Sequence, residues 1–146
     1  MKTQIYFVLG PTASGKSKFA LNLAEKLNGE IINADSMQIY RDLSILTARP
    51  TLEDQKKVNH HLYGFVKGDV RFNVQKWCEE ASKKINYLVN NNITPILVGG
   101  TGLYIESLIN GIVSIPFIPE TVKKESDKII LKIGKENFFN LVKEHD

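Results

Sequence analysis

The chain has 146 residues, 42% of them hydrophobic and 24% charged, which is the size and composition of one globular domain with a single core. Disordered, collagen-like and membrane-spanning proteins are disfavoured by this composition. The net charge of +3 permits an anionic partner without requiring one. One cysteine, no export signal and no apolar stretch of about 18 residues predict a cytoplasmic protein with no membrane segment.

Apolar strands alternate with amphipathic helices along the first three quarters of the chain. In chain order the pattern predicts a strand over 5–9, a helix over 16–27, a strand over 30–33, a helix over 74–89, a strand over 93–98 and a helix over 103–109. This alternation predicts an α/β fold, a parallel sheet of the P-loop NTPase-like kind flanked by helices.

The carboxyl ends of these strands lead into turns rich in glycine or polar residues, over 10–17, 34–38 and 99–101. In a parallel sheet all three turns open at one edge, where ligands bind. We expect the strand over 30–33 to lie directly beside the strand over 5–9, so that the first two turns are neighbours.

Beyond Pro119 the pattern changes to lysine-rich helical segments over 120–133 and 135–143. We therefore divide the chain into a P-loop α/β core over 1–111 and a small helical appendage over 112–146, read as the start of an incomplete insertion or C-terminal region. The appendage has more apolar side chains than the predicted sheet can cover, which predicts self-association or a mobile tail. These side chains are Ile129, Ile130, Ile133, Phe138, Phe139 and Val142.

The first turn fits the pattern G-x-x-x-x-G-K-[ST] between a predicted strand and a predicted helix, which is the context that a phosphate-binding loop requires. Its glycines let backbone N–H groups surround a phosphate, Lys16 neutralises charge, and the Ser17 hydroxyl can hold Mg²⁺. The alternative is a glycine-rich turn that binds nothing. The predicted diphosphate- or nucleotide-binding residues are Gly10, Pro11, Thr12, Ala13, Ser14, Gly15, Lys16 and Ser17.

Asp35 ends the second strand, where a carboxylate can bind Mg²⁺ through water or accept a proton from an incoming nucleophile. The alternative is a helix N-cap or an Asx-turn. His60 and His61 do not suggest zinc, because adjacent side chains point to different faces of a strand or helix. Trp77 and Cys78 lie on the apolar face of their helix, which favours core packing.

Several further segments make the sequence recognisable: Ala34-Asp-Ser-Met-Gln-Ile-Tyr-Arg41, Thr47-Ala-Arg-Pro50, His60-His-Leu62 and Pro95-Ile-Leu-Val-Gly-Gly-Thr-Gly-Leu-Tyr104. Together with the glycine loop they resemble the tRNA dimethylallyltransferase family over residues 5 to 124. Two features depart from the family: Leu46 stands where glycine is usual, and family members continue well beyond residue 146. The chain therefore resembles an N-terminal part of a family member.

The resemblance implies transfer of a dimethylallyl group from dimethylallyl diphosphate to N6 of the adenosine beside the anticodon of tRNA. It assigns the diphosphate to the loop with Mg²⁺ held by Ser17, and catalytic roles to Lys16, Asp35 and Thr101. Contacts to the tRNA are implied for Asp35, Ser36, Met37, Gln38, Thr101 and Lys123. From the residues alone, Thr101 is also a candidate N-cap and Lys123 a solvated helix lysine.

Two other functions stay open at this point. The loop also fits a small-molecule kinase that binds ATP, with Asp35 receiving a hydroxyl proton. The second alternative is a non-catalytic fragment that keeps the phosphate and nucleotide turns without closing over RNA.

Overall fold

The computed structural model describes residues 4–113 and 118–145. Its backbone forms two compact units, Met1–Ile112 and Val113–Asp146. The first contains β1 (Tyr6–Leu9), α1 (Lys16–Leu27), β2 (Gly29–Asn33), a short 3-10 helix (Arg41–Leu43), α2 (Leu52–Lys57), β3 (His60–His61), α3 (Val74–Asn90), β4 (Thr94–Gly99) and α4 (Gly102–Asn110), and the second contains α5 (Glu120–Ile133) and α6 (Lys135–Lys143). The predicted elements agree with these bounds within one residue.

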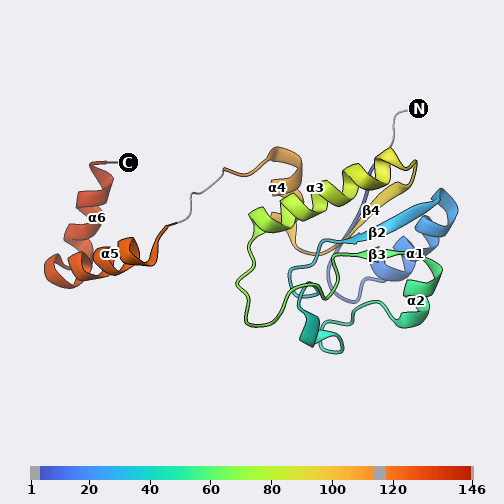
Figure 1. Ribbon diagram of the computed structural model, residues 1–146, viewed down its shortest axis with the longest axis horizontal. Helices are drawn as coiled ribbons and strands as arrows, with labels where there is room; N and C mark the ends of the chain where they lie inside the picture. Colours follow the sequence, from blue (N-terminus) through green and yellow to red (C-terminus); the bar gives the residue numbers. More distant parts are fainter. Residues whose placement is uncertain (1–3, 114–117, 146) are drawn as a thin grey trace. The chain divides into compact units, whose positions relative to one another are not determined.

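The sheet has four parallel strands in the order β1-β4-β2-β3, which confirms the predicted α/β fold with helices on both sides (Figure 1). The expectation that β2 lies beside β1 is wrong, because β4 pairs with both strands and separates them. β4 takes the central place because its residues are buried without interruption from Pro95 to Gly99. In β1, by contrast, every second side chain is exposed, as suits an edge strand.

Two apolar clusters cover the two faces of the sheet. On one face, Ile32 and Leu97 pack against Trp77 of α3 and Tyr104 of α4. On the other, Ile31, Ile96 and Val98 pack against Ala20, Leu21 and Ala24 of α1. Trp77 is fully buried and its ring stacks on Tyr104 with centroids 4.4 Å apart, so the predicted core role of Trp77 is confirmed.

Three elements between β2 and α3 were not predicted: the 3-10 helix Arg41–Leu43, α2 and β3. α2 is short, and its order comes from a capping box in which Thr51 and Asp54 bond each other's backbone N–H groups. β3 has two residues and exists because it pairs with Ile31 and Ile32 of β2. Its His61 ring makes a hydrogen bond with the Glu30 carboxylate, and its His60 ring contacts the carbonyl oxygen of Val58 at 2.7 Å.

The unit Val113–Asp146 contains the two predicted helices with the predicted bounds. None of the residues of α5 and α6 is buried, and Ile130, Ile133 and Phe138 are half-buried. Ile129, Phe139 and Val142 are exposed. Self-association of the chain stays a prediction. Among the described residues, no helix is long and apolar enough to cross a membrane.

The close approach of Gly99 at the end of β4 to the backbone of Ala34 after β2 leads to a stability prediction. A Cβ at Gly99 would overlap the backbone of Ala34, so we expect Gly99→Ala to reduce the free energy of unfolding by about 2 to 3 kcal/mol. Urea unfolding measures the loss. Gly102→Ala is the matched control, because a Cβ there meets no atom within 4 Å, and its stability should equal or slightly exceed that of the unmodified chain. Equal stability of the two variants would contradict the close approach.

Candidate active site

The turns that follow β1 and β2 and the C-terminal end of β4 meet around one cavity of about 350 Å³, at the edge of the sheet where the strands end. A fourth segment, Leu46 to Ala48, completes the wall. The lining residues are Thr12, Ala13, Lys16, Ser17, Asp35, Met37, Gln38, Leu46, Thr47, Ala48, Val98 and Gly99. The structure therefore places the glycine loop and Asp35 in the walls of the same cavity.

The glycine loop connects β1 to α1 in a conformation suited to an anion. Ala13 and Gly15 have φ angles of 64° and 81°, a left-handed backbone that arranges successive N–H groups around a concave surface. No side chain caps the N-terminus of α1, so the amides of its first turn are not occupied by a cap. The Lys16 ammonium donates to the carbonyl oxygen of Pro11 at 2.8 Å, which holds the lysine against the loop.

The oxygen donors in the cavity fit a Mg²⁺ ion that is held partly by a substrate. Ser17 lines the cavity at the start of α1, and Asp35 lines it at the end of β2. Mg²⁺ prefers oxygen ligands and is usually bound through one or two protein groups together with phosphates and waters. In residues 4–113 and 118–145 no cluster of three His, Cys, Asp or Glu side chains forms a metal cage, so the substrate would have to supply part of the coordination.

Asp35 stands in a tight turn, and the predicted Asx-turn is present. Its Oδ1 accepts a hydrogen bond from the N–H of Met37 at 2.8 Å. Oδ2 has no hydrogen-bond partner in the part of the chain that the structure describes, and the side chain is half-exposed at the cavity. The Asx-turn and a proton-accepting role are therefore compatible, because they use different oxygens of one carboxylate.

Thr101 joins the turn after β4 to the turn after β2. Although Thr101 is the N-cap residue of α4, its side chain makes no capping hydrogen bond, so the simple N-cap interpretation is wrong. Its Oγ1 instead accepts from the N–H of Ser36 at 2.9 Å and donates to the Ser36 hydroxyl oxygen at 3.3 Å. The structure thus connects two of the predicted site residues, Thr101 and Ser36, directly.

A buried side chain that was not predicted, that of Asn33, holds the other side of the Asp35 turn. The Asn33 amide bonds both peptide groups of Asp35 and the carbonyl oxygen of Leu62. A polar amide that ends the apolar run Ile31-Ile32 immediately before a polar turn is the sequence signal that could have identified it.

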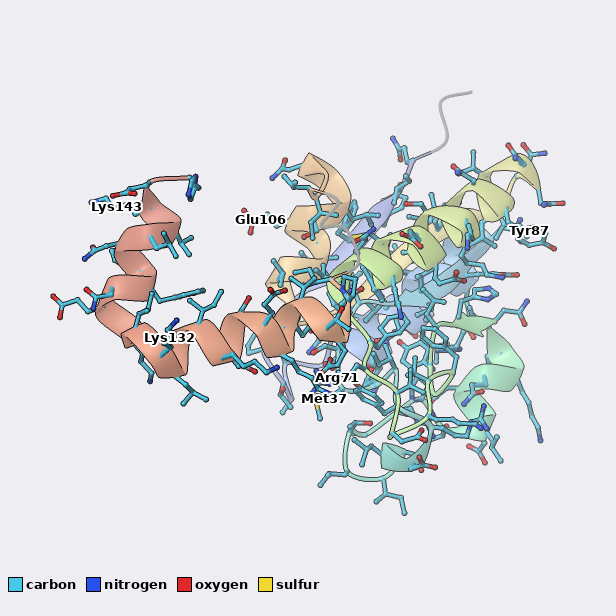
Figure 2. The ribbon with its side chains drawn as sticks, turned by 60° about the vertical axis from the view of Figure 1, so that its left-hand side comes forward. Met37, Arg71, Tyr87, Glu106, Lys132 and Lys143 are labelled. Atoms are coloured by element: carbon cyan, nitrogen blue, oxygen red, sulfur yellow. The ribbon has the colours of Figure 1, made fainter. Side chains whose placement is uncertain are left out.

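Gln38 and Met37 differ in how far they are available to a ligand. The Gln38 side-chain nitrogen donates to the carbonyl oxygens of Thr47 at 2.7 Å and Ala48 at 3.3 Å, so it holds the opposite wall of the cavity. Met37 makes no such contact through its side chain, which is 50% exposed, and it is labelled in Figure 2. Their predicted contacts to tRNA remain predictions.

Lys123, the last predicted site residue, lies on α5 in the unit Val113–Asp146. Its ammonium is 3.8 Å from the Glu120 carboxylate, and both side chains are exposed. This arrangement is that of a solvated helix lysine, and contact between Lys123 and tRNA stays a prediction.

Two tyrosines near Asp35, Tyr63 and Tyr104, have raised pKa values. Burial, and then the negative charge of Asp35, raise the pKa of Tyr63 well above its ordinary value. Burial, followed by nearby Tyr40 and Asp35, raises the pKa of Tyr104 to about 12.

Comparison with known proteins agrees with this geometry. A sequence model of the IPP transferase family matches residues 38–146. The chain belongs to this family. It is 50% identical over 138 residues to the tRNA dimethylallyltransferase of Pelagibacter ubique, covering 94% of this chain and 44% of the relative. Its identity to the enzyme of that name from Ehrlichia chaffeensis is 39% over 142 residues, covering 97% of this chain and 46% of the relative.

Two solved structures of the family carry the same fold. The full-length tRNA isopentenylpyrophosphate transferase of Bacillus halodurans is 33% identical, with a TM-score of 0.74 over 99% of this chain and 48% of the other. A eukaryotic dimethylallyltransferase acting on tRNA is 30% identical, with a TM-score of 0.75 over 82% of this chain and 31% of the other. The chain therefore spans less than half the length of the family members it matches.

Proposed function

We propose that this chain binds dimethylallyl diphosphate and transfers its five-carbon group to N6 of the adenosine beside the anticodon of tRNA. One observation carries the proposal: the glycine loop and Asp35 line a single cavity. The relatives named tRNA dimethylallyltransferase, which extend well beyond the length of this chain, support the choice of donor and acceptor.

The glycine loop would hold the leaving group. Diphosphate departs with increasing negative charge, which Lys16 and the backbone amides of the loop would stabilise where it develops. A Mg²⁺ ion held by Ser17 would neutralise part of the same charge when bound. Since the Lys16 ammonium bonds Pro11 in the described structure, diphosphate would replace that carbonyl oxygen as its partner.

Asp35 would act at the acceptor. As N6 of adenine forms its bond to the allylic carbon, the bond between that carbon and the diphosphate oxygen breaks, and N6 must lose a proton. The free Oδ2 of Asp35 is the acceptor that the cavity offers for this proton. Adenine reaches the cavity only when it is turned out of the anticodon-loop stack, at a cost of about a few kcal/mol.

A small-molecule kinase and a non-catalytic fragment, the two alternative functions, would differ from the transferase in the ligands they bind or the reaction they carry out. A small-molecule kinase would bind ATP in the glycine loop, but the comparisons favour the transferase. A non-catalytic fragment would bind diphosphate without transferring the dimethylallyl group. Binding and transfer are therefore measured separately.

The binding test is a thermal unfolding series with Mg²⁺ and increasing ligand. We expect dimethylallyl diphosphate to stabilise the chain by about 2.7 kcal/mol at a concentration 100 times its Kd, because it binds the folded state alone. Inorganic diphosphate should give a smaller shift in the same direction, and dimethylallyl alcohol, which lacks the phosphates, should give none. A shift with ATP and none with the allylic diphosphate would contradict the proposal and favour the kinase.

A further inference from the structure

We propose that Asn33 is a positioning residue that fixes the direction in which Asp35 presents its free carboxylate oxygen. The inference rests on the proposed function for its catalytic purpose, and on contacts in the fold for its physical basis. Asn33 is completely buried at the end of β2, two residues before Asp35, and contributes nothing to the cavity wall.

The Asn33 amide bonds both backbone groups of Asp35. Its Oδ1 accepts from the Asp35 N–H at 2.9 Å, and its Nδ2 donates to the Asp35 carbonyl oxygen at 3.0 Å. On the far side of the turn, the next N–H, that of Ser36, is held by Thr101. Because the peptide groups before and after the Asp35 Cα are both fixed, its φ and ψ angles are fixed too.

The fixed backbone determines where the carboxylate points. Asp35 Oδ1 is already held by the N–H of Met37, so Oδ2 has a defined direction as long as the turn keeps its shape. Proton transfer needs the base within hydrogen-bond distance of the reacting group, and small misplacements are costly in rate. Rotation of the Asp35 peptide groups would move Oδ2 without removing it.

Asn33 connects Asp35 to two other parts of the core, to one through its side-chain amide and to the other through its backbone carbonyl oxygen. Nδ2 also donates to the carbonyl oxygen of Leu62 at 3.0 Å, and Leu62 has a φ of 62°, a strained value for a branched residue. The indole nitrogen of Trp77 donates to the Asn33 carbonyl oxygen at 2.9 Å. The Asp35 turn is thus anchored through Asn33 to the segment after β3 and to α3.

A primary amide has the donors and acceptor that this position requires. Three contacts are made by one acceptor oxygen and two N–H donors on a planar group. Serine has one hydroxyl and a shorter reach, and a carboxylate would set negative charge against two carbonyl oxygens. Asn33→Ser therefore removes most of these contacts while leaving Asp35 itself unchanged.

The test combines hydrogen exchange with steady-state kinetics on the full chain. Exchange of the Ser36 and Met37 amides is measured by NMR relative to that of Leu97 in the central strand, in the unmodified chain and in Asn33→Ser. We expect the relative exchange of both amides to rise at least tenfold. In transfer to an anticodon stem-loop, kcat should fall at least tenfold while KM for dimethylallyl diphosphate stays within twofold.

Two further variants separate positioning from general stability. Trp77→Phe keeps an aromatic ring against Tyr104 but loses the N–H that donates to the backbone carbonyl oxygen of Asn33. Like Asn33→Ser, it should raise the relative exchange and lower kcat, each by two- to fivefold. Leu88→Ala is the matched control. Leu88 is buried in the same apolar cluster as Trp77, but it lies near the C-terminal end of α3. It should lower the melting temperature without changing the relative exchange or kcat.

The outcomes distinguish this inference from the proposed function. Unchanged relative exchange in Asn33→Ser, or exchange that rises with kcat unaffected, overturns the positioning role. An equal loss of kcat in Leu88→Ala overturns it as well, since the effect would then follow stability. Absence of transfer by the unmodified chain overturns the proposed function and the catalytic purpose of Asn33. The relative exchange of the Ser36 and Met37 amides then still decides whether Asn33 holds the turn.

Discussion

Asp35→Asn is expected to lower the rate of dimethylallyl transfer by about 10² to 10⁴. The amide keeps the size of the carboxylate and can still accept the hydrogen bond from Met37, so the turn should survive. It loses the ability to take the proton that leaves N6. Single-turnover transfer to an anticodon stem-loop measures the chemical step separately from product release.

The same variant should bind dimethylallyl diphosphate almost as well as the unmodified chain, because the phosphates would contact the glycine loop. Asp42→Asn is the matched control: Asp42 is an exposed carboxylate in the 3-10 helix and does not line the cavity. A rate within tenfold of the unmodified chain for Asp35→Asn would leave Asp35 as a turn residue and remove it from proton transfer.

Lys16→Ala is expected to weaken binding of dimethylallyl diphosphate by about 10- to 100-fold, because a charge-assisted hydrogen bond contributes about 1.5 to 3 kcal/mol. The thermal shift produced by a fixed ligand concentration near Kd should therefore disappear. Isothermal titration with Mg²⁺ present measures the affinity directly.

A control at the other end of the same helix checks that the effect is local. Lys26→Ala removes an equal charge from the last turn of α1 and should leave the affinity unchanged. Without ligand, Lys16→Ala loses only the contact to Pro11, so its melting temperature should stay close to that of the unmodified chain. Unchanged affinity in Lys16→Ala would show that the loop does not hold the diphosphate.

The main elements of the fold could be predicted from hydrophobic periodicity, but the order of the strands could not. Periodicity identifies β2 and β4 as strands, whereas their neighbours depend on how the crossover through α3 packs. Short elements were missed for a related reason. β3 is defined by pairing with β2, a contact between residues about 30 positions apart in the chain that no local pattern contains.

Most of the cavity wall, except for the segment Leu46 to Ala48, was predictable because distinctive residue types stand at strand ends. The glycine loop and Asp35 follow strands directly, so a parallel sheet brings them to one edge. The contacts of Asn33 and Gln38 were not predictable, since both side chains bond backbone carbonyl oxygens of irregular segments, 29 residues away for Asn33 and nine for Gln38. Thr101 was identified as a site residue, but its bond to Ser36 required the structure.

The position of β4 between β1 and β2 also sets the interval that the proposed donor would have to span. Adjacent strands lie about 4.8 Å apart, so the ends of β1 and β2 are separated by about 9.6 Å. A donor whose phosphates sit in the glycine loop has to extend its reactive carbon across this interval to meet a nucleophile beside Asp35. With the proposed donor bound in the loop, this interval of two strand spacings would favour a diphosphate ester over a monophosphate ester, which would be shorter.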